Sequence, residues 1–208
     1  MIAITLVGAI STGMLIAMRT GLLTLEKTQN RLQENRKVMA LQQLLVRQVA
    51  NVVPALGICG PVFAGNAAGF HMVTSYSLAE GYRGLEQLVE YRILPDPEKG
   101  GLQLIEIERP YFSPTSAALF CPDQPPAAGG QPFEIARGLA VARIWYHENV
   151  PELPNGGNWL SGWTRPNMPS AVKIEIAPMR VEPGHLTLQT VSVPIRINRE
   201  VVATYDDN

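Results

Sequence analysis

The sequence contains few of the residues that carry catalytic or metal chemistry. Its three histidines are His71, His147 and His185, and none pairs with another His, Cys or carboxylate at the spacing of a metal site. G-x-S-x-G, P-loop and G-x-G-x-x-G motifs are absent, and the serines are scattered without a nucleophile motif. Catalytic groups can be distant in sequence, so these absences argue against an enzyme only modestly. We expect no catalytic residue, cofactor or metal.

An excess of basic charge is also absent. Seventeen Lys and Arg stand against eighteen Asp and Glu, and the formal net charge is −1. Proteins that bind nucleic acid usually gather positive charge on one face, so no nucleic-acid partner is expected. Two acidic spots, Asp96 with Glu98 and Asp206 with Asp207, lack the dense alternating carboxylates of a calcium site. We interpret them as solvated turn or tail charges.

No charged residue precedes Arg19, and the run from Met1 to Met18 is mostly apolar. A secretory signal would carry a basic segment first and a small-residue cleavage site afterwards, and neither is present. As a helix the run would be about 27 Å long, close to the hydrocarbon core of about 30 Å. It is apolar on every face, whereas a helix at the edge of a domain shows a polar stripe. The pattern favours a membrane anchor.

The helical pattern continues beyond Arg19 without a proline until Pro54. Apolar residues then recur at steps of three and four, which is the period of a helix: Val38, Leu41, Leu45, Val49 and Val52. Pro54 and Gly57 are typical of a helix end. The sequence therefore predicts one helix from near Met1 to about Val53, about 80 Å long.

Residues 54–208 predict a β-rich domain. The clearest unit is a β-hairpin, with strands over 88–94 and 102–108 and a long turn rich in proline and glycine. Further strands are expected over 69–77, 139–148, 170–178 and 186–197. Two segments rich in Pro and Gly, 121–132 and 149–168, are expected to be loops. Trp159 and Trp163 lie in the second; they either contact a partner or fold back onto the sheet.

The first 32 residues resemble the N-terminal region of type IV pilins and of the pseudopilins of type II secretion. "MIAITLVGAISTGMLIAMRTGLLTLEKTQNRL" is similar to the continuation of the family signature, starting one residue after its Phe-Thr-Leu-(Leu/Ile)-Glu-Val segment. On this resemblance the sequence lacks a basic leader and about six mature residues. The family's glutamate and its peptidase cleavage site therefore fall on no residue here. Leader cleavage and methylation are implied for the natural protein.

Three later stretches resemble the J-type minor pseudopilins: "VEYRILPDPEKGGLQLIEIER", "LAVARIWYHE" and "GWTRPNMPSAVKIEIAP". The resemblance implies an α+β, pilin-like fold in which a long N-terminal helix packs on antiparallel sheet. It divides the chain into a transmembrane part (1–21), an amphipathic periplasmic helix (22–53) and a periplasmic globular domain (54–208) in the bacterial inner membrane.

The implied function is structural. Such a protein forms the tip of the pseudopilus with I- and K-type minor pseudopilins and the major pseudopilin, and starts assembly for the export of folded proteins. A W-type minor pilin that primes a type IV pilus shares some of these motifs. A membrane-tethered periplasmic enzyme or ligand-binding domain is the alternative from another class. A polar linker after the anchor would favour that alternative, and the sequence shows none.

Two further predictions concern a possible disulfide and a possible partner interface. Cys59 and Cys121 are the only cysteines; in the oxidising periplasm they either form a disulfide or remain two buried thiols. On a helical wheel, the stripe from Val38 to Val52 is flanked on one side by Met39, Val46 and Val53. A helix lying on a sheet needs an apolar arc little wider than about 100°, and this arc is wider. We predict that the stripe packs on the chain's own sheet and that the flank meets a partner helix.

Overall fold

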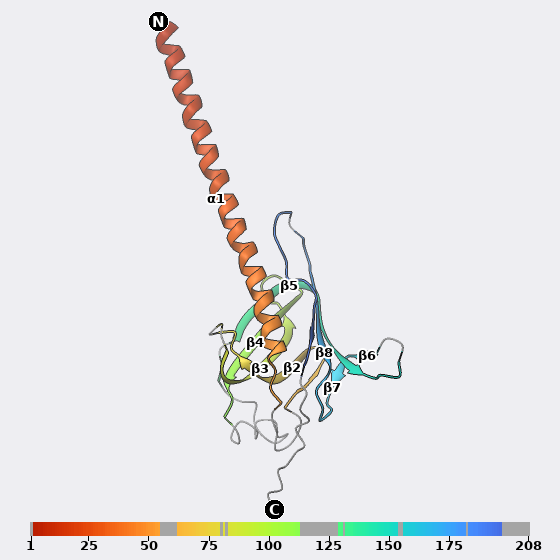
Figure 1. Cartoon of the computed structure of the whole chain (residues 1–208). Coiled ribbons are helices and arrows are strands. Elements are labelled where there is room, and N and C mark those ends of the chain that lie inside the picture. Colours follow the sequence, from red (N-terminus) through yellow and green to blue (C-terminus); the bar gives the residue numbers. More distant parts are fainter. Residues whose placement is uncertain are drawn as a thin grey trace, which may run out of the picture.

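The computed structural model describes residues 2–54, 62–79, 81, 83–112, 129–130, 132–153, 156–181 and 183–196, without the side chains of 2–12 and 83. One helix, α1 (Ile2–Ala50), precedes all the strands (Figure 1). The strands are β1 (Ala64–Asn66), β2 (Gly69–Tyr76), β3 (Arg83–Pro95), β4 (Leu102–Pro110), β5 (Pro132–Asn149), β6 (Gly157–Leu160), β7 (Gly162–Trp163), β8 (Ala171–Pro178) and β9 (Val191–Pro194).

The predicted α+β class is wrong, because the described chain is mostly β. Its strands form one antiparallel sheet in the order β7-β1-β2-β3-β4-β5-β8-β9, with β6 also paired to β5. The predicted packing of a long helix on this sheet is shown only in part. The C-terminal turns of α1 lie against the sheet, whereas its N-terminal half extends away from the domain (Figure 1).

The helix ends close to its predicted limit. Asn51 closes it, because its backbone and side-chain amides both donate to the carbonyl of Arg47, at 3.0 and 2.7 Å. The chain then turns and pairs with β2 through a bridge between Val52 and Thr74. Pairing with a strand requires an extended backbone, so α1 stops at Ala50 rather than at Val53.

The predicted hairpin is confirmed and extends on both sides. β3 and β4 pair from Gln87↔Pro110 to Pro95↔Leu102, so the turn lies between Pro95 and Leu102. Gly100 and Gly101 adopt positive φ angles of 72° and 76° there, which glycine accepts at little cost. The expected strands over 69–77, 139–148 and 170–178 correspond to β2, β5 and β8, whereas only four residues of 186–197 form a strand, β9.

The expected loop over 149–168 is partly wrong, because it contains β6 and β7. β6 pairs with the end of β5, and β7 pairs with the three-residue β1, which had no counterpart among the predicted strands. The other expected loop, 121–132, lies almost entirely outside the described residues. These short strands enlarge the sheet beyond the prediction, and this is one reason why the class is mostly β.

The long strand β5 curls the sheet. Its first half pairs with β4 and its second half with β8, and the change occurs around Gly138, whose φ is 64°. Beyond this point β5 turns toward the β1–β2 hairpin, where the Ile144 amide donates to the Ala67 carbonyl at 3.1 Å. The Tyr146 hydroxyl is 2.9 Å from the Asn66 carbonyl and 3.2 Å from that of Gly69. These bonds hold distant strands together around one core.

Aromatic and aliphatic side chains fill the inside of this curl. Phe70 stacks on Tyr91 with ring centres 4.9 Å apart, and Tyr146 meets Phe63 and Phe70 edge-on. α1 contacts β2, the third strand from one edge of the sheet, and β9, the strand at the other edge. Leu45, Val49 and Val52 are buried in the core, and Val38 packs at its margin. The last turns of α1 are therefore part of the core.

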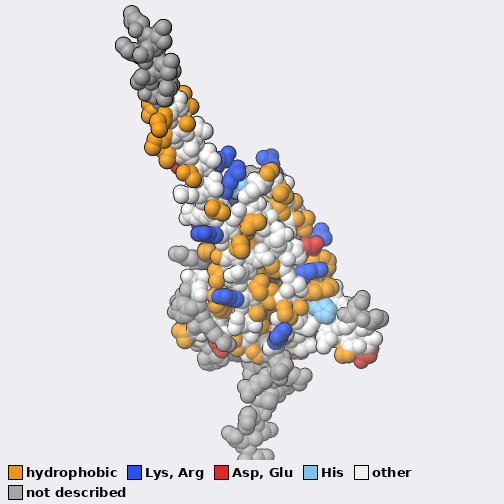
Figure 2. All heavy atoms as spheres, turned by 45° about the horizontal axis from the view of Figure 1, so that its top comes forward, with side chains coloured by type: hydrophobic (Ala, Val, Ile, Leu, Met, Phe, Trp, Pro, Cys, Tyr) orange, Lys and Arg blue, Asp and Glu red, His pale blue; other side chains and the backbone are white. Residues whose placement is uncertain are grey.

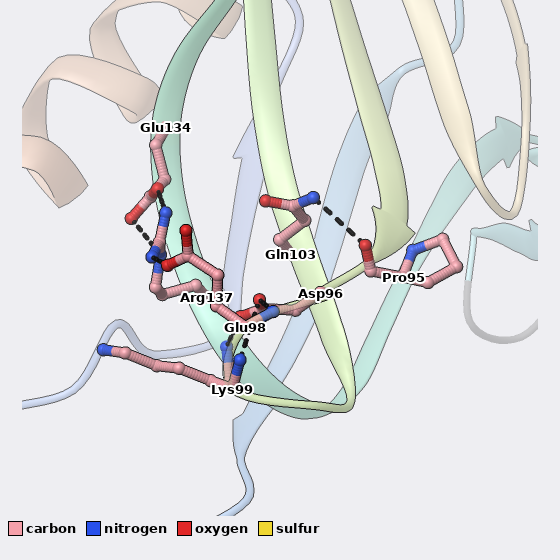
Figure 3. Close-up of polar contacts among 8 residues, drawn as sticks. Pro95, Asp96, Glu98, Lys99, Gln103, Glu134 and Arg137 are labelled. Atoms are coloured by element: carbon pink, nitrogen blue, oxygen red, sulfur yellow. Dashed lines mark hydrogen bonds and ion pairs between the residues drawn. The ribbon is translucent and has the colours of Figure 1, made fainter.

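Asp96 organises the β3–β4 turn and attaches it to β5 (Figure 3). One carboxylate oxygen accepts from the amides of Glu98 and Lys99 at 2.9 and 3.1 Å. The other accepts from the Gly138 amide at 3.1 Å, where β5 changes partner. These backbone bonds lower the pKa of Asp96, the Lys99 amide most. Asp96 is therefore a buried turn residue and not the solvated charge that the sequence suggested.

We expect Asp96→Ala to lower the melting temperature by several degrees at pH 7, because three amides lose their acceptor. A lowered carboxyl pKa stabilises the fold above the ordinary value of 3.8, and this contribution disappears as the pH falls through the lowered pKa. The gap between the melting temperatures of wild type and variant should therefore narrow at pH 3.

Glu98→Ala is the matched control. Its carboxylate is exposed and only pairs with Arg137 at 2.6 Å, which contributes little in water. Equal melting temperatures for wild type and Asp96→Ala at pH 7 would contradict a role for Asp96 in the turn.

Candidate functional site

The projecting half of α1 exposes large apolar side chains. From Met14 to Leu25 seven of them are each more than half exposed: Met14, Leu15, Ile16, Met18, Leu22, Leu23 and Leu25. Figure 2 shows these side chains gathered near the described start of the helix, away from the sheet. Around Gly13 and Gly21 there is open space beyond the helix itself. A large exposed apolar surface marks an interaction site.

Three threonines along this segment keep their hydroxyls within the helix. Thr20, Thr24 and Thr28 donate to the carbonyls of Ile16, Thr20 and Thr24 at 2.8 to 2.9 Å. Each hydroxyl is thereby satisfied four residues back along the chain. The segment can therefore meet an apolar environment without leaving these donors unpaired.

The predicted partner flank is spread over three environments. Met39 is 54% exposed. Val46 is half-buried against the main core cluster, and Val53 is half-buried against a second cluster formed by Val62, Val73, Leu88 and Tyr111. Of the three, Met39 is thus the residue that the fold leaves open to a partner. Cys59 and Cys121 lie outside the described residues.

The second feature is a buried polar cluster where α1 meets the sheet. It consists of Gln48 on α1, Tyr91 on β3, and Glu106 and Glu108 on β4, and we call it the joint cluster. The Gln48 amide nitrogen donates to Glu106 at 3.1 Å and to Glu108 at 3.0 Å, and its oxygen accepts from the Tyr91 hydroxyl. Both hydrogens and the oxygen of the amide are therefore used. Gln48, Tyr91 and Glu106 are almost fully buried.

β2 completes the attachment of α1. The Thr74 hydroxyl is 2.8 Å from the Gln48 carbonyl and 3.0 Å from that of Asn51. Glu108 accepts from the Leu78 amide at 2.7 Å, the Ala79 amide at 3.1 Å and the Ser77 hydroxyl at 3.0 Å. The joint cluster thus links α1, β3 and β4 with the segment after β2.

Burial, and to a smaller extent the neighbouring Glu108 charge, raise the pKa of Glu106 to about 7 against the opposing hydrogen bond from Gln48. Burial also raises the pKa of the Tyr91 hydroxyl, with the two carboxylates contributing. Near neutral pH the carboxyl of Glu106 is therefore close to half protonated. Sequence reasoning missed this cluster.

The two tryptophans of the 149–168 segment lie in different places. Trp163 is buried in the core, and its indole nitrogen donates to the Asn167 carbonyl at 2.7 Å. Trp159 is 38% exposed and meets His147 edge-on. In the described part of the chain no group of three His, Cys, Asp or Glu side chains could hold a metal ion.

No known family model matches the chain, and neither does any curated protein. Among the residues whose side chains the structure describes, no helix is long and apolar enough to cross a membrane. The predicted span, 1–21, includes residues 1–12, whose side chains are not among them.

Proposed function

We propose that the chain is a structural minor pseudopilin of J type. It would be anchored in the bacterial inner membrane, with its β domain in the periplasm, and would act at the pseudopilus tip. There it would meet I- and K-type minor pseudopilins and the major pseudopilin, and start assembly for protein export. The support from sequence is the set of motifs that resemble this family.

One observation carries the proposal. The same unbroken helix has exposed apolar side chains between Met14 and Leu25 and buried core side chains at Leu45 and Val49. A rigid apolar rod continuous with a domain core suits a subunit whose helix is to be buried by membrane and neighbours. A tethered enzyme or binding domain needs an anchor but has no need of this rigid connection.

The test is assembly with partners. The full chain would be co-expressed with I- and K-type minor pseudopilins and captured from a detergent extract through a tag on the chain. Both partners should be recovered with the wild-type chain. The proposed function would be overturned if one or both partners were not recovered with the chain.

Met39→Asp tests the predicted interface within this function. Met39 is exposed, so the change should leave the melting temperature within about 2 °C of wild type. At a partner helix it would bury an unpaired charge, and recovery of the partners should fall at least tenfold. Val46→Asp is unsuitable because Val46 also packs on the chain's own core.

Ala40→Asp is the matched control, because it places the same charge on an exposed neighbouring position about 100° around the helix. It should leave partner recovery unchanged. Equal recovery with Met39→Asp and wild type would remove Met39 from the interface while leaving the proposed function intact.

A further inference from the structure

The joint cluster places two carboxylates on one amide in the core. Glu106 and Glu108 are two residues apart on β4 and therefore lie on the same face of the sheet. Both accept from the Gln48 nitrogen at 3.0 to 3.1 Å. One amide can donate to both oxygens, but it carries no positive charge to offset two ionised carboxylates.

Among the residues that the structure describes, none places a compensating positive charge on Glu106. From α1 it is met by the neutral amide of Gln48, and from β3 by Tyr91, its direct cross-strand neighbour. On β5 its cross-strand neighbour is Phe133, and the β2 side of the cluster offers the hydroxyls of Thr74 and Ser77. Among the described residues, neither carboxylate forms an ion pair with a lysine or arginine.

The two carboxylates differ in how they tolerate charge. Glu108 is half-buried and accepts hydrogen bonds from two backbone amides and a hydroxyl. Glu106 is buried and accepts from the same Gln48 that ties α1 to the sheet. When one of the two carboxylates is protonated, we therefore place the proton on Glu106.

We propose that the joint cluster is a proton-dependent latch, which holds the end of α1 on the sheet when Glu106 is protonated and releases it when both carboxylates are ionised. Release would separate Gln48 from β4 and let water reach Glu106. The bonds around the joint that would open with it are Val53 amide to Val73 carbonyl, 2.7 Å, and Ser75 amide to Asn51 carbonyl, 3.1 Å. The latch does not depend on the proposed function.

The direction follows from linkage. Burial raises the pKa of Glu106 from 4.5 to about 7, so the closed joint binds a proton that the open joint releases between these values. Opening therefore becomes more favourable as the pH rises. With these two values, the open fraction should increase about tenfold between pH 6 and pH 8.5.

The experiment is amide hydrogen exchange on the full chain in mild detergent, expressed as protection factors so that intrinsic exchange is removed. Protection of the Val53 and Ser75 amides should fall about tenfold from pH 6 to pH 8.5. At pH 8.5 both should be at least tenfold less protected than the Ile174 amide in buried β8. Unchanged protection of the joint, or a joint that opens only together with Ile174, would overturn the latch.

Glu106→Gln should remove the pH dependence, because the amide keeps its shape and hydrogen bonding but cannot ionise. Glu86→Gln, which changes an exposed carboxyl of β3, should keep the tenfold fall in amide protection between pH 6 and pH 8.5. If amide protection still falls in Glu106→Gln, the proposal is overturned. Should that variant fail to fold, carbon-13 titration of wild-type Glu106 decides: a midpoint near pH 7 supports the latch and one below pH 5 overturns it.

Discussion

Tyr146→Ala is expected to lower the free energy of unfolding by about 4–5 kcal/mol, the cost of removing a large aromatic side chain from a core. Tyr146 is fully buried, and its ring contacts Phe63 and Phe70. Its hydroxyl also bonds to two carbonyls of the β1–β2 hairpin. The residue therefore attaches the second half of β5 to β1 and β2, two strands with which β5 forms no ladder. Urea unfolding with the full chain measures the effect.

Tyr146→Phe separates the hydroxyl from the ring. Only the two bonds to Asn66 and Gly69 are lost, and the cost should be about 1–2 kcal/mol. Burial raises the pKa of the hydroxyl, so it stays protonated and a donor throughout the neutral range. Stability of Tyr146→Ala within about 1 kcal/mol of wild type would show that the curl does not depend on this residue.

Gln48→Leu should cost about 3–5 kcal/mol, although it replaces a polar residue in the core with an apolar one of similar size. The change removes the Gln48 donor from Glu106 and the acceptor from Tyr91, whereas Glu108 keeps its bonds from Ser77, Leu78 and Ala79. Each buried polar group left without a partner costs about 1–3 kcal/mol. The melting temperature should fall by about 10 °C in a chain of this size.

Gln43→Leu provides the comparison on the same helix, because Gln43 is exposed. Its effect should stay within about 0.5 kcal/mol of wild type. If Gln48→Leu were as stable as Gln43→Leu, the joint cluster would not be what holds α1 on the sheet.

Local patterns were enough to predict α1 and the β3–β4 hairpin. The helix signal is a run without proline and with apolar residues at steps of three and four, and the hairpin signal is the Pro95 to Gly101 turn between two alternating runs. Both depend on neighbours in sequence. The bonds of Asp96 to Glu98 and Lys99 are of the same local kind.

The fold class could not be predicted in this way. It depends on β5 changing partner near Gly138 and on β7 pairing with β1, and these pairings join segments far apart in sequence. The pairing of β6 with the end of β5 is local but lies in a segment whose Pro, Gly and Asn content predicted a loop. β-Structure of this kind is set by packing across strands more than by residue preference. The short β1 and β7 have almost no signal of their own.

The joint cluster was hidden for a related reason. In "LIEIER" the alternation alone suggests that Ile105 and Ile107 face inward, whereas Glu106 is the more deeply buried residue. Glu106 is tolerated there because Gln48 comes from α1, 58 residues away. A buried carboxyl that depends on one distant amide has no sequence signature.

The length of α1 makes it a lever. The hydrogen bonds of Gln48 and Thr74 hold its end, and farther along Asn35 bonds to Gly184 and Leu186 at 3.1 and 2.7 Å. From Asn35 to Gly13 the helix runs for about 33 Å at about 1.5 Å per residue. If this part tilts by about 5°, its far end moves sideways by about 3 Å, roughly a third of the spacing between two packed helices. Small rearrangements where α1 contacts the domain, too slight to alter the sheet, would therefore change the direction of the whole projecting part of the helix.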